Sequence, residues 1–564
     1  MAWKKDQIKP RPYQIEDCNS LIDMERMLVA CDTGVGKTVT YLYTAEKLMA
    51  RRKIIKTFIY CPASTLDQIE SVIRKNTTSD CVVVRGNPKQ RQQCYYKARR
   101  DSVKYVLMGM SVTLWNERKK IESLVIACKK KGELAVVVDE AYYLKSGPHK
   151  VNEWDKEKPK RVRAIFALRE YFKYRFPVTG TPVQNIPGDI YWLFYFMYDR
   201  KILGSKNEFD QTYSRFNQWG VPVGFRNLNK FYRRIEPYMI RREATDPEVS
   251  KYMPKMVVEN ILVDIPSNSV RKLYYKIRQD TISALTKLAS YGPDQNLDAK
   301  RLEQKRMVLR KAQSRYAHLR MLCVGGSYLI KKRADNLVAE NKKRSEKKTS
   351  YALQLVTNKE TAKYFVKPIR GPKLDTIPEF VSSILRENPK FKFVIFSFFK
   401  DIVEDVRVTL GKHVKCKIVT CKGGDNAQEK KDQFNEDPNT RILITTDANK
   451  EGVDLPGGSH LIHLDVPANH ALWHQRSTRI RRNGSKHKRV FIFNAIARGT
   501  IEERQWDHIE RTHEMSNAIV DGMKHRREVI EESKGRVITG LKLNEKSLLQ
   551  FLKSDTFGIH DDEI

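Results

Sequence analysis

The chain has 564 residues, of which 40% are hydrophobic and 10% aromatic, so it can bury several cores and is not a wholly disordered polymer. Lysine and arginine number 105 against 67 aspartates and glutamates, and the formal net charge of +38 favours a polyanionic partner. No apolar run approaches the roughly 18 residues that span a bilayer, and residues 1–6 lack a signal-peptide core, so a soluble intracellular protein is expected. The nine cysteines include no C-x-x-C pair, which argues against a disulfide framework and a structural zinc site.

The positive charge is concentrated in three stretches. Residues 300–320 carry eight basic residues against one glutamate, and residues 331–348 carry eight against three acids. Residues 466–489 carry seven lysines and arginines and no acid. Any one stretch could be a solvated surface. The three together favour nucleic acid, since no amphipathic basic helix suited to a membrane surface accompanies them.

Short β-branched runs, separated by longer amphipathic stretches, recur in two blocks of the chain. In the first block they lie at residues 27–30, 54–60, 81–84, 105–108 and 134–138. In the second block they lie at residues 391–396, 416–420, 441–445, 461–464 and 489–494. This alternation predicts two α/β domains, each a parallel sheet covered by helices.

The middle of the chain differs in composition and in the spacing of its apolar residues. Residues 270–341 have few glycines and carry apolar residues at three- and four-residue spacing, which predicts a helical insertion. The expected organisation is an N-terminal lobe at 1–260, a helical insertion at 261–350, a C-terminal lobe at 351–520 and a weakly patterned tail at 521–564.

A phosphate-binding pattern follows the first expected strand. Residues 31–38 read C-D-T-G-V-G-K-T and precede an expected helix at 39–50, so they match the form G-x-x-x-x-G-K-T except for Cys31 in place of the first glycine. In such a loop the backbone around Gly34, Val35 and Gly36 can approach phosphate oxygens. Lys37 can reach the β and γ phosphates, and Thr38 can bind Mg²⁺. A glycine-rich turn is the alternative interpretation.

Two carboxylates follow another apolar strand. Residues 134–142 read L-A-V-V-V-D-E-A-Y, which places Asp139 and Glu140 at the carboxyl end of a strand too apolar to be exposed. Ligands of parallel sheets bind at this edge. Asp139 can therefore hold Mg²⁺, and Glu140 can orient or deprotonate the water that attacks a γ phosphate. The alternative is a solvated acidic turn.

At this point the sequence resembles the superfamily-two helicase-like ATPases, and in particular their Swi/Snf-type branch of DNA translocases. The resemblance covers about residues 8–503. In the first block it rests on R-P-Y-Q at 11–14, D-E-A-Y at 139–142 with L-K-S at 144–146, T-G-T-P-V-Q-N at 179–185, I-R-R at 240–242 and L-R-M-L-C at 319–323. In the second block it rests on V-I-F-S at 394–397, T-T-D-A at 445–448, E-G-V-D-L at 451–455, Q-R-S-T-R-I-R-R-N-G at 475–484 and G-T-I-E-E at 499–503. Tyr142 stands where the family has histidine.

The resemblance implies two RecA-like parallel-sheet lobes, ATP and Mg²⁺ as cofactors, and specific roles for many residues. The implied catalytic residues are Lys37, Asp139, Glu140, Gln475, Arg479 and Arg482, the last two acting across the cleft between the lobes. The implied nucleotide-binding residues are Arg11, Gln14, Gly34, Val35, Gly36, Lys37, Thr38, Gly452 and Asp454, and the magnesium ligands are Thr38 and Asp139. The candidate nucleic-acid contacts are Pro62, Ser64, Thr113, Ser397, Lys422 and Thr446.

The expected function is that of an ATP-dependent translocase or remodeller that acts, as a monomer, on duplex or branched DNA. No chromatin-reader or nuclease segment is recognised beyond the motor motifs, which favours a compact motor, and a viral source is compatible with it. Two other classes stay open. One is a strand-separating helicase on DNA or RNA, and the other is a basic nucleic-acid-binding protein with an inactive ATPase core.

Overall fold

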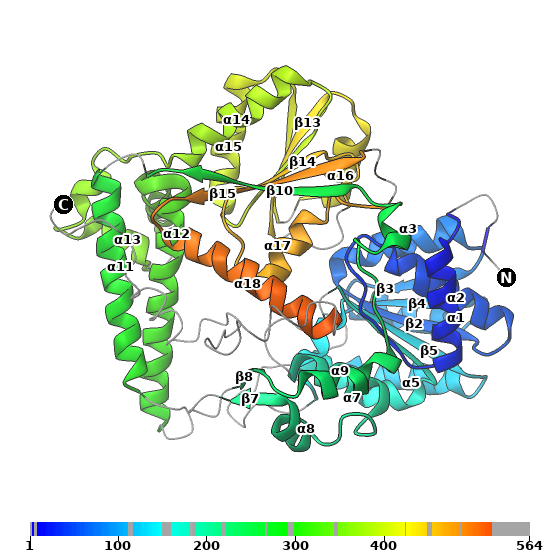
Figure 1. Ribbon diagram of the computed structural model, residues 1–564. Helices are drawn as coiled ribbons and strands as arrows, with labels where there is room; N and C mark the ends of the chain where they lie inside the picture. The colour runs from blue at the N-terminus through cyan, green and yellow to red at the C-terminus, as the bar shows by residue number, and fades with distance from the viewer. Residues whose placement is uncertain are drawn as a thin grey trace.

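The computed structural model describes residues 3–4, 8–110, 117–148, 160–180, 182, 188–216, 222–265, 268–291, 298–342, 348–423, 425–447, 454–483, 485 and 487–521. Two α/β lobes lie against each other, and two long helices project beside the second lobe (Figure 1). No helix among the described residues combines the length and the apolar character needed to cross a membrane.

The first lobe is built on a seven-stranded sheet in which every pairing is parallel. Its strand order is β3-β4-β2-β5-β6-β1-β9. The strands are β1 (Leu28–Val29), β2 (Lys56–Cys61), β3 (Asp80–Val84), β4 (Val103–Gly109), β5 (Leu134–Asp139), β6 (Tyr174–Val178) and β9 (Met239–Ile240).

Helices cover both faces of this sheet, which is why its central strand β5 is apolar from Leu134 to Val138. Val136 and Val138 of β5 belong to one buried core, whereas Ala135 and Val137 belong to another, because successive side chains of a strand point to opposite faces. The main helices are α1 (Pro12–Met24), α2 (Lys37–Ala50), α3 (Leu66–Asn76), α4 (Pro88–Ala98), α5 (Arg118–Lys129), α6 (Lys160–Leu168) and α7 (Gly188–Tyr198). A smaller unit follows, with α8 (Lys206–Tyr213), the antiparallel pair β7 (Ser214–Phe216) and β8 (Pro222–Phe225), α9 (Leu228–Ile235) and α10 (Pro247–Ser250).

The second lobe is also built on a sheet whose pairings are all parallel, with the order β10-β15-β14-β11-β13-β12. Its strands are β10 (Lys255–Val263), β11 (Phe393–Ser397), β12 (Lys417–Cys421), β13 (Thr440–Thr446), β14 (His460–His463) and β15 (Arg489–Ala497). Its helices are α14 (Lys373–Glu387), α15 (Val403–His413), α16 (Ala427–Glu436), α17 (His470–Ser477) and α18 (Ile501–Asp521).

The chain enters the second lobe earlier than the sequence suggests. Strand β10 pairs along its whole length with β15, from Lys255 opposite Arg489 to Val263 opposite Ala497. The boundary expected at residue 260 therefore falls inside a strand of the second sheet. The helical insertion follows β10, so it leaves from the second lobe and returns to it.

This insertion consists of α11 (Asn268–Ala289), α12 (Ala299–Asn341) and the short α13 (Tyr351–Thr357). The two long helices lie side by side, and we call the three helices the helical arm (Figure 1). Helix α12 is kinked at Gly326, whose φ of 65° is left-handed. A Cβ atom at this position would lie 2.4 Å from the carbonyl oxygen of Ile369, so only glycine fits the kink.

Both blocks of predicted strands are confirmed, and so is the helical character of residues 270–341. Strand β6 was not predicted, because its sequence Y-R-F-P-V interrupts an apolar run with a charge and a proline. The structure nevertheless buries Arg175 to 2% exposure, where its guanidinium donates to the carbonyl oxygens of Phe172 and Met197 and pairs with Glu170.

A buried ion pair joins the elements at the centre of the second lobe. The ammonium of Lys373, at the start of α14, lies 2.6 Å from Oε2 of Glu502 in α18, and both side chains are fully buried. The same ammonium donates to the carbonyl oxygens of Leu464 and Ala495, and Glu502 also accepts from the backbone N–H of Ala497. Glu502, from the G-T-I-E-E segment, therefore holds a helix and two strand ends together.

We expect Lys373→Met to lower the free energy of unfolding by about 3 to 5 kcal/mol, because it leaves the Glu502 charge buried without its partner. Arg407→Ala is the control, since it breaks an exposed pair with Glu404 that solvent screens, so its effect on the free energy of unfolding should be much smaller. Chemical denaturation of both variants measures the difference, and equal losses would contradict the structural role of Lys373.

Candidate active site

The loop between β1 and α2 has the shape of an anion cradle. Gly34 has a φ of 92°, and Gly36 precedes the first residue of α2, so backbone N–H groups and the positive end of the helix dipole meet here. A Cβ atom on Gly34 would lie 2.6 Å from the carbonyl oxygen of Arg481 in the second lobe. The glycine is thus required both by the backbone conformation and by the close approach of the other lobe.

Lys37, the first residue of α2, lies inside this loop. Its ammonium donates to the carbonyl oxygens of Cys31 and Asp32, each at 3.0 Å. Burial lowers the pKa of Lys37, and the charges of Glu140 and Asp139 oppose that shift. The ammonium is therefore held between the loop backbone and two carboxylates, at the position from which a phosphate-loop lysine acts.

The two carboxylates stand where the sequence placed them, at the carboxyl end of β5. The backbone N–H of Glu140 donates to Oδ1 of Asp139 at 3.0 Å, and Glu140 has a left-handed φ of 51°. Burial raises the pKa of Asp139 to about 7, and the neighbouring Glu140 charge adds to the increase. Two adjacent carboxylates that are only partly exposed are an arrangement that a divalent cation would stabilise.

The predicted magnesium ligands fit such a cation. Thr38 and Asp139 both lie close to the hydroxyl of Tyr41, which is only 1% exposed. Two hydroxyls and a carboxylate form an oxygen-rich site of the kind that hydrated Mg²⁺ occupies.

The second lobe contributes two arginines and the carboxylate that holds them. Asp454 pairs with Nη2 of Arg482 at 2.6 Å and with Nη1 of Arg479 at 3.6 Å. Burial would raise the pKa of Asp454, but the two guanidinium groups outweigh it and hold that pKa below its usual value. The other carboxylate oxygen accepts a hydrogen bond from Gln68 of the first lobe at 2.8 Å, so this ion pair network spans the cleft.

Arg11 and Gln14 close the site from the side of α1. The amide of Gln14 accepts from the backbone N–H of Arg11 at 2.8 Å and donates to the carbonyl oxygen of Gly36 at 3.1 Å. Gln14 thereby braces the phosphate loop. Arg11 reaches Asn483 of the second lobe, whose own backbone N–H points at the carbonyl oxygen of Gly34.

These groups line one cleft of about 390 Å³ between the lobes. It collects nearly all of the predicted nucleotide and catalytic residues, namely Arg11, Gln14, Gly34, Gly36, Lys37, Thr38, Asp139, Glu140, Asp454, Arg479 and Arg482. The side chain of Val35 is buried beside the cleft, and its carbonyl oxygen accepts from the hydroxyl of Tyr13. Gly452 lies outside the described residues.

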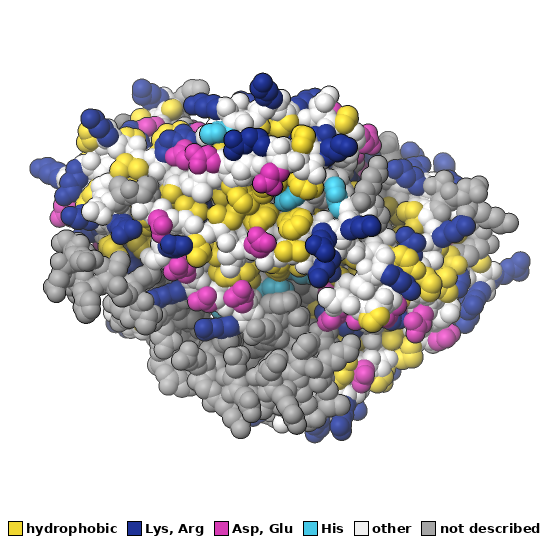
Figure 2. Space-filling view, turned by 45° about the horizontal axis from the view of Figure 1, so that its top comes forward, with side chains coloured by type: hydrophobic (Ala, Val, Ile, Leu, Met, Phe, Trp, Pro, Cys, Tyr) yellow, Lys and Arg dark blue, Asp and Glu magenta, His cyan; other side chains and the backbone are white. Residues whose placement is uncertain are grey.

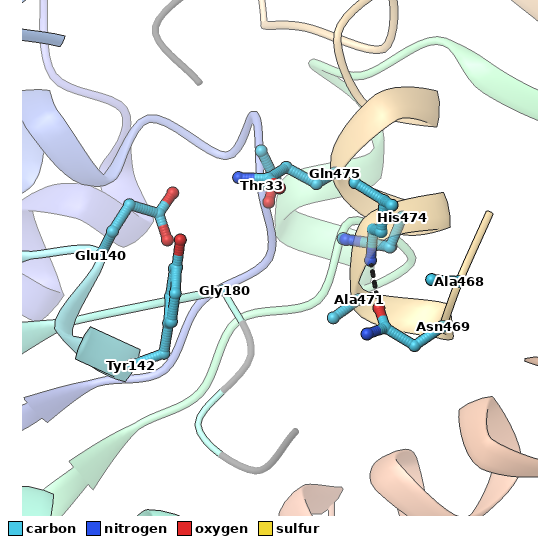
Figure 3. A pocket seen from close by; sticks show the side chains of 10 residues that line it. Thr33, Glu140, Tyr142, Gly180, Ala468, Asn469, Ala471, His474 and Gln475 are labelled. Carbon is cyan, nitrogen blue, oxygen red and sulfur yellow. Dashed lines mark hydrogen bonds between the residues drawn. The ribbon is translucent and has the colours of Figure 1, made fainter. Parts of the chain in front are cut away.

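Gln475 lies in an adjoining cavity of about 280 Å³, which shares Thr33 and Glu140 with the cleft. Figure 3 shows Gln475 reaching from α17 toward Thr33, while Glu140 and Tyr142 approach each other on the first lobe. Gln475 therefore shares a cavity with Glu140, facing it from the second lobe.

The candidate nucleic-acid residues are less uniform. Ser64 is exposed beyond β2 and Lys422 is partly exposed beyond β12, whereas Pro62 and Thr446 are buried. Ser397 is fully buried, and its hydroxyl donates to Oδ2 of Asp465 at 2.9 Å, so in this conformation it is not available to a phosphate. Thr113 lies outside the described residues.

Two polar residues of the cleft were missed by sequence reasoning. Gln68 is on α3 and Asn483 follows Arg482, and each bonds a residue of the opposite lobe. Gln68 belongs to no pattern that the sequence singles out, and Asn483 lies within the segment 475–484 without having been assigned a role. Only the position of Asn483 directly after the arginine pair could have drawn attention to it.

Family models match both halves of this architecture. One described as SNF2-related domain matches residues 13–323, which is more than half of the 564 residues, and one described as Helicase conserved C-terminal domain matches residues 373–484. The chain belongs to the SNF2-related family of helicase-like ATPases. The resemblance predicted from the motifs is thereby confirmed.

Relatives of this SNF2-related chain include an uncharacterised ATP-dependent helicase of Mycoplasma genitalium, 24% identical over 85% of this chain, and the putative helicase/translocase YwqA of Bacillus subtilis, 21% identical over 88%. The chain spans 38% and 47% of the length of these two relatives. Among solved structures, the Hef helicase domain of Pyrococcus furiosus shares the fold, with a TM-score of 0.52 at 17% identity, over 90% of this chain and 99% of that one.

The raised pKa of Asp139 predicts a stability effect that depends on pH. The carboxyl gains its proton near pH 7 in the folded chain but near 3.8 when unfolded, so its burial destabilises the fold increasingly as the pH rises between these values. We expect Asp139→Asn to raise the Tm at pH 8 by about 2 to 4 °C, the shift that about 1 kcal/mol produces in a lobe of this size. The gain should shrink at pH 5, and thermal unfolding at both pH values checks it.

Proposed function

We propose that the chain hydrolyses ATP with Mg²⁺ and uses the reaction to move along duplex or branched DNA. The observation that carries the proposal is that Arg479 and Arg482 of the second lobe share one cleft with Lys37, Asp139 and Glu140 of the first. Hydrolysis then depends on how the two lobes are placed, and closing and opening of the cleft can be tied to the state of the phosphates.

Each residue acts at a distinct point of the reaction. The backbone N–H groups of the phosphate loop and the Lys37 ammonium bind the β and γ phosphates. These donors are already in position before the reaction starts. Glu140 orients the attacking water and accepts its proton, with Gln475 on the other side of that water. Arg479 and Arg482 stabilise the negative charge that develops on the transferred phosphoryl group.

Thr38 and Asp139 would hold the magnesium ion, which supplies Lewis-acid neutralisation of the phosphate charge. Asp139 is held toward that position by the backbone N–H of Glu140. Asp454 keeps the two arginines from repelling each other, so their guanidinium groups stay in the cleft rather than turning to solvent.

The candidate nucleic-acid surface lies on the helical arm. In the first half of α12 the exposed basic residues are Lys300, Arg301, Arg306, Arg310 and Lys311. Exposed lysines and arginines bind phosphates and carry no base information, so little sequence preference is expected. In the view of Figure 2, lysine and arginine side chains stand mainly around the edge while hydrophobic side chains gather toward the middle, so the basic residues are not concentrated at the centre of that face.

The arginines of the third basic stretch do not add to this surface as far as residue 482. Arg476, Arg479 and Arg481 are all under 9% exposed, and Arg482 faces the cleft. These four arginines therefore serve the interior and the nucleotide site, whereas Lys488 and Arg489 of the same stretch are exposed.

A strand-separating helicase on DNA or RNA is the second candidate, and the measurement that separates it from a translocase is strand displacement on forked substrates. An inactive ATPase core is disfavoured by the complete set of charged residues in the cleft. ATPase activity with duplex DNA, single-stranded DNA and RNA, together with displacement of a third strand from a DNA triplex, tests the proposal.

We expect Lys37→Ala and Glu140→Gln to abolish hydrolysis while leaving salt-sensitive DNA binding intact, because the phosphate site and the arm are different surfaces. Arg482→Ala should lower kcat by about 10³-fold, the smallest effect expected for an arginine supplied across a cleft, with a modest loss of ATP affinity. Steady-state kinetics and nucleotide titrations distinguish the two kinds of variant. If Arg482→Ala lost ATP binding as severely as Lys37→Ala, the two-lobe mechanism would be wrong.

Duplex DNA should stimulate hydrolysis more than single strands or RNA. Binding should weaken with salt at a slope near −0.9 per neutralised phosphate, so about six contacts would lose roughly 10³-fold in affinity between 50 and 200 mM salt. The triple charge reversal Arg306→Glu, Arg310→Glu and Lys311→Glu should weaken binding for all sequences alike, as measured by titration at several salt concentrations.

The matched control reverses three exposed lysines at helix α5 of the first lobe, namely Lys119, Lys120 and Lys130, and so makes the same change in net charge. Equal losses in both triple variants would indicate a general effect of charge rather than a surface on α12. Preferential stimulation by RNA would reject the duplex-translocase proposal.

A further inference from the structure

A second cluster of charges lies behind the active site, inside the second lobe. Its centre is Asp465, two residues beyond β14, whose side chain is fully buried. One carboxylate oxygen accepts from the hydroxyl of Ser397 at 2.9 Å and from the backbone N–H of Phe398 at 2.6 Å. The other lies 3.5 Å from Nη2 of Arg320 and 3.5 Å from Nη1 of Arg476.

Arg476 connects this cluster to the active site. It is fully buried, and its Nε and Nη2 atoms bond both oxygens of Asp447 at 2.6 and 2.7 Å. Arg476 follows Gln475 directly on α17, and its carbonyl oxygen accepts a hydrogen bond at 3.1 Å from the backbone N–H of Arg479, just past the end of that helix. A displacement of the Arg476 side chain would therefore be transmitted to the residues that face the phosphates.

Arg320 connects the same cluster to the helical arm. It lies on α12, and its Nη2 atom also donates to the carbonyl oxygen of Val466 at 2.8 Å. Its guanidinium stands 5.2 Å from the ring centre of Phe398, a side chain that is 51% exposed. The exposed Arg310 is ten residues earlier on the helix, about 15 Å away along its axis. A rigid helix thus runs from the candidate DNA surface to Asp465.

The cluster contains two cations, Arg320 and Arg476, and two anions, Asp447 and Asp465. Charges this deeply buried are tolerated only when each is paired in a defined geometry. Such a network resists sliding of one element past another, in contrast to an apolar contact, which can repack. It is therefore suited to fix the position of α12 relative to α17.

We propose that Asp465 is a positioning residue that couples α12 to the arginine pair of the active site, so that engagement of α12 by nucleic acid raises the turnover of ATP. The inference rests on the proposed function. In this proposal Arg320, from the L-R-M-L-C segment, transmits the engagement of α12 by nucleic acid. Asp465 connects Arg320 to Arg476.

The test compares Arg320→Lys with Arg315→Lys. A lysine keeps the charge but lacks the planar fork that reaches Val466 and Asp465 together. Arg315 is the matched control on the same helix, because its guanidinium bonds the carbonyl oxygen of Asp280 and lies over the ring of Tyr351 instead. The readout is the ratio of kcat with saturating duplex DNA to kcat without DNA. Both rates are measured on the same variant, so a change in basal activity cancels.

We expect Arg320→Lys to lower this ratio about fivefold or more, in the range of ordinary coupling between sites, with DNA affinity and the KM for ATP within about twofold of the unmodified chain. Arg315→Lys should leave the ratio unchanged. Asp465→Asn should lower the ratio as well, and the double variant with Arg320→Lys should be no worse than the more impaired single variant, because both changes break one connection.

A merely structural role of the cluster would lower the Tm and reduce both rates together, so an unchanged ratio in Arg320→Lys would overturn the coupling. Additive losses in the double variant would also overturn it. If the unmodified chain bound no nucleic acid, or bound it without any change in turnover, the proposed function itself would be rejected and the coupling with it.

Discussion

The arrangement of the two lobes depends on the pairing of Asp454 with the arginines of the cleft. Arg479 and Arg482 would repel each other and the nearby Lys37 if no carboxylate lay between them. One oxygen of Asp454 holds both guanidinium groups, and the other accepts from Gln68 of the first lobe. A single side chain thereby sets the spacing of the arginines and ties them to helix α3 of the opposite lobe.

The positive charge of the chain has two different uses. Some of it lies on the exposed first half of α12, where it can meet phosphates. Another part lies inside the second lobe, where Arg476 and Arg320 are compensated by Asp447 and Asp465. The sequence between 466 and 489 contains no acid, because the carboxylates that compensate its arginines lie just before it or earlier in the chain. A count of charges along the sequence therefore overestimates how much of the surface is basic.

Much of the site could be predicted because it lies at strand ends. A phosphate loop, an apolar strand ending in Asp139 and Glu140, and an arginine motif are local patterns, and a parallel sheet brings such ends to one edge. The orientation of single side chains is not local. Ser397 ends β11, one residue beyond the run predicted at 391–396, yet its hydroxyl donates to Asp465, a residue 68 positions later. Gln68 and Asn483 enter the site only because the lobes meet there.

The parallel pairing of β10 with β15 has a consequence for how force passes between the lobes. Strand β10 is an edge strand, and it begins directly after Pro254, whose carbonyl oxygen accepts a hydrogen bond from Arg481 beside the phosphate loop. The chain passes from one lobe to the other between β9 of the first sheet and β10 of the second. Because this connecting segment is held in a sheet at each end, it can extend little when the lobes move apart. A second lobe produced by cutting after residue 260 would lose six of the nine residues of this strand and expose the backbone of β15, which is a recognised cause of aggregation. The second lobe should therefore be isolated by cutting before Lys255, which keeps β10 whole. In the intact chain, a movement of the first lobe is transmitted to the second sheet through this strand.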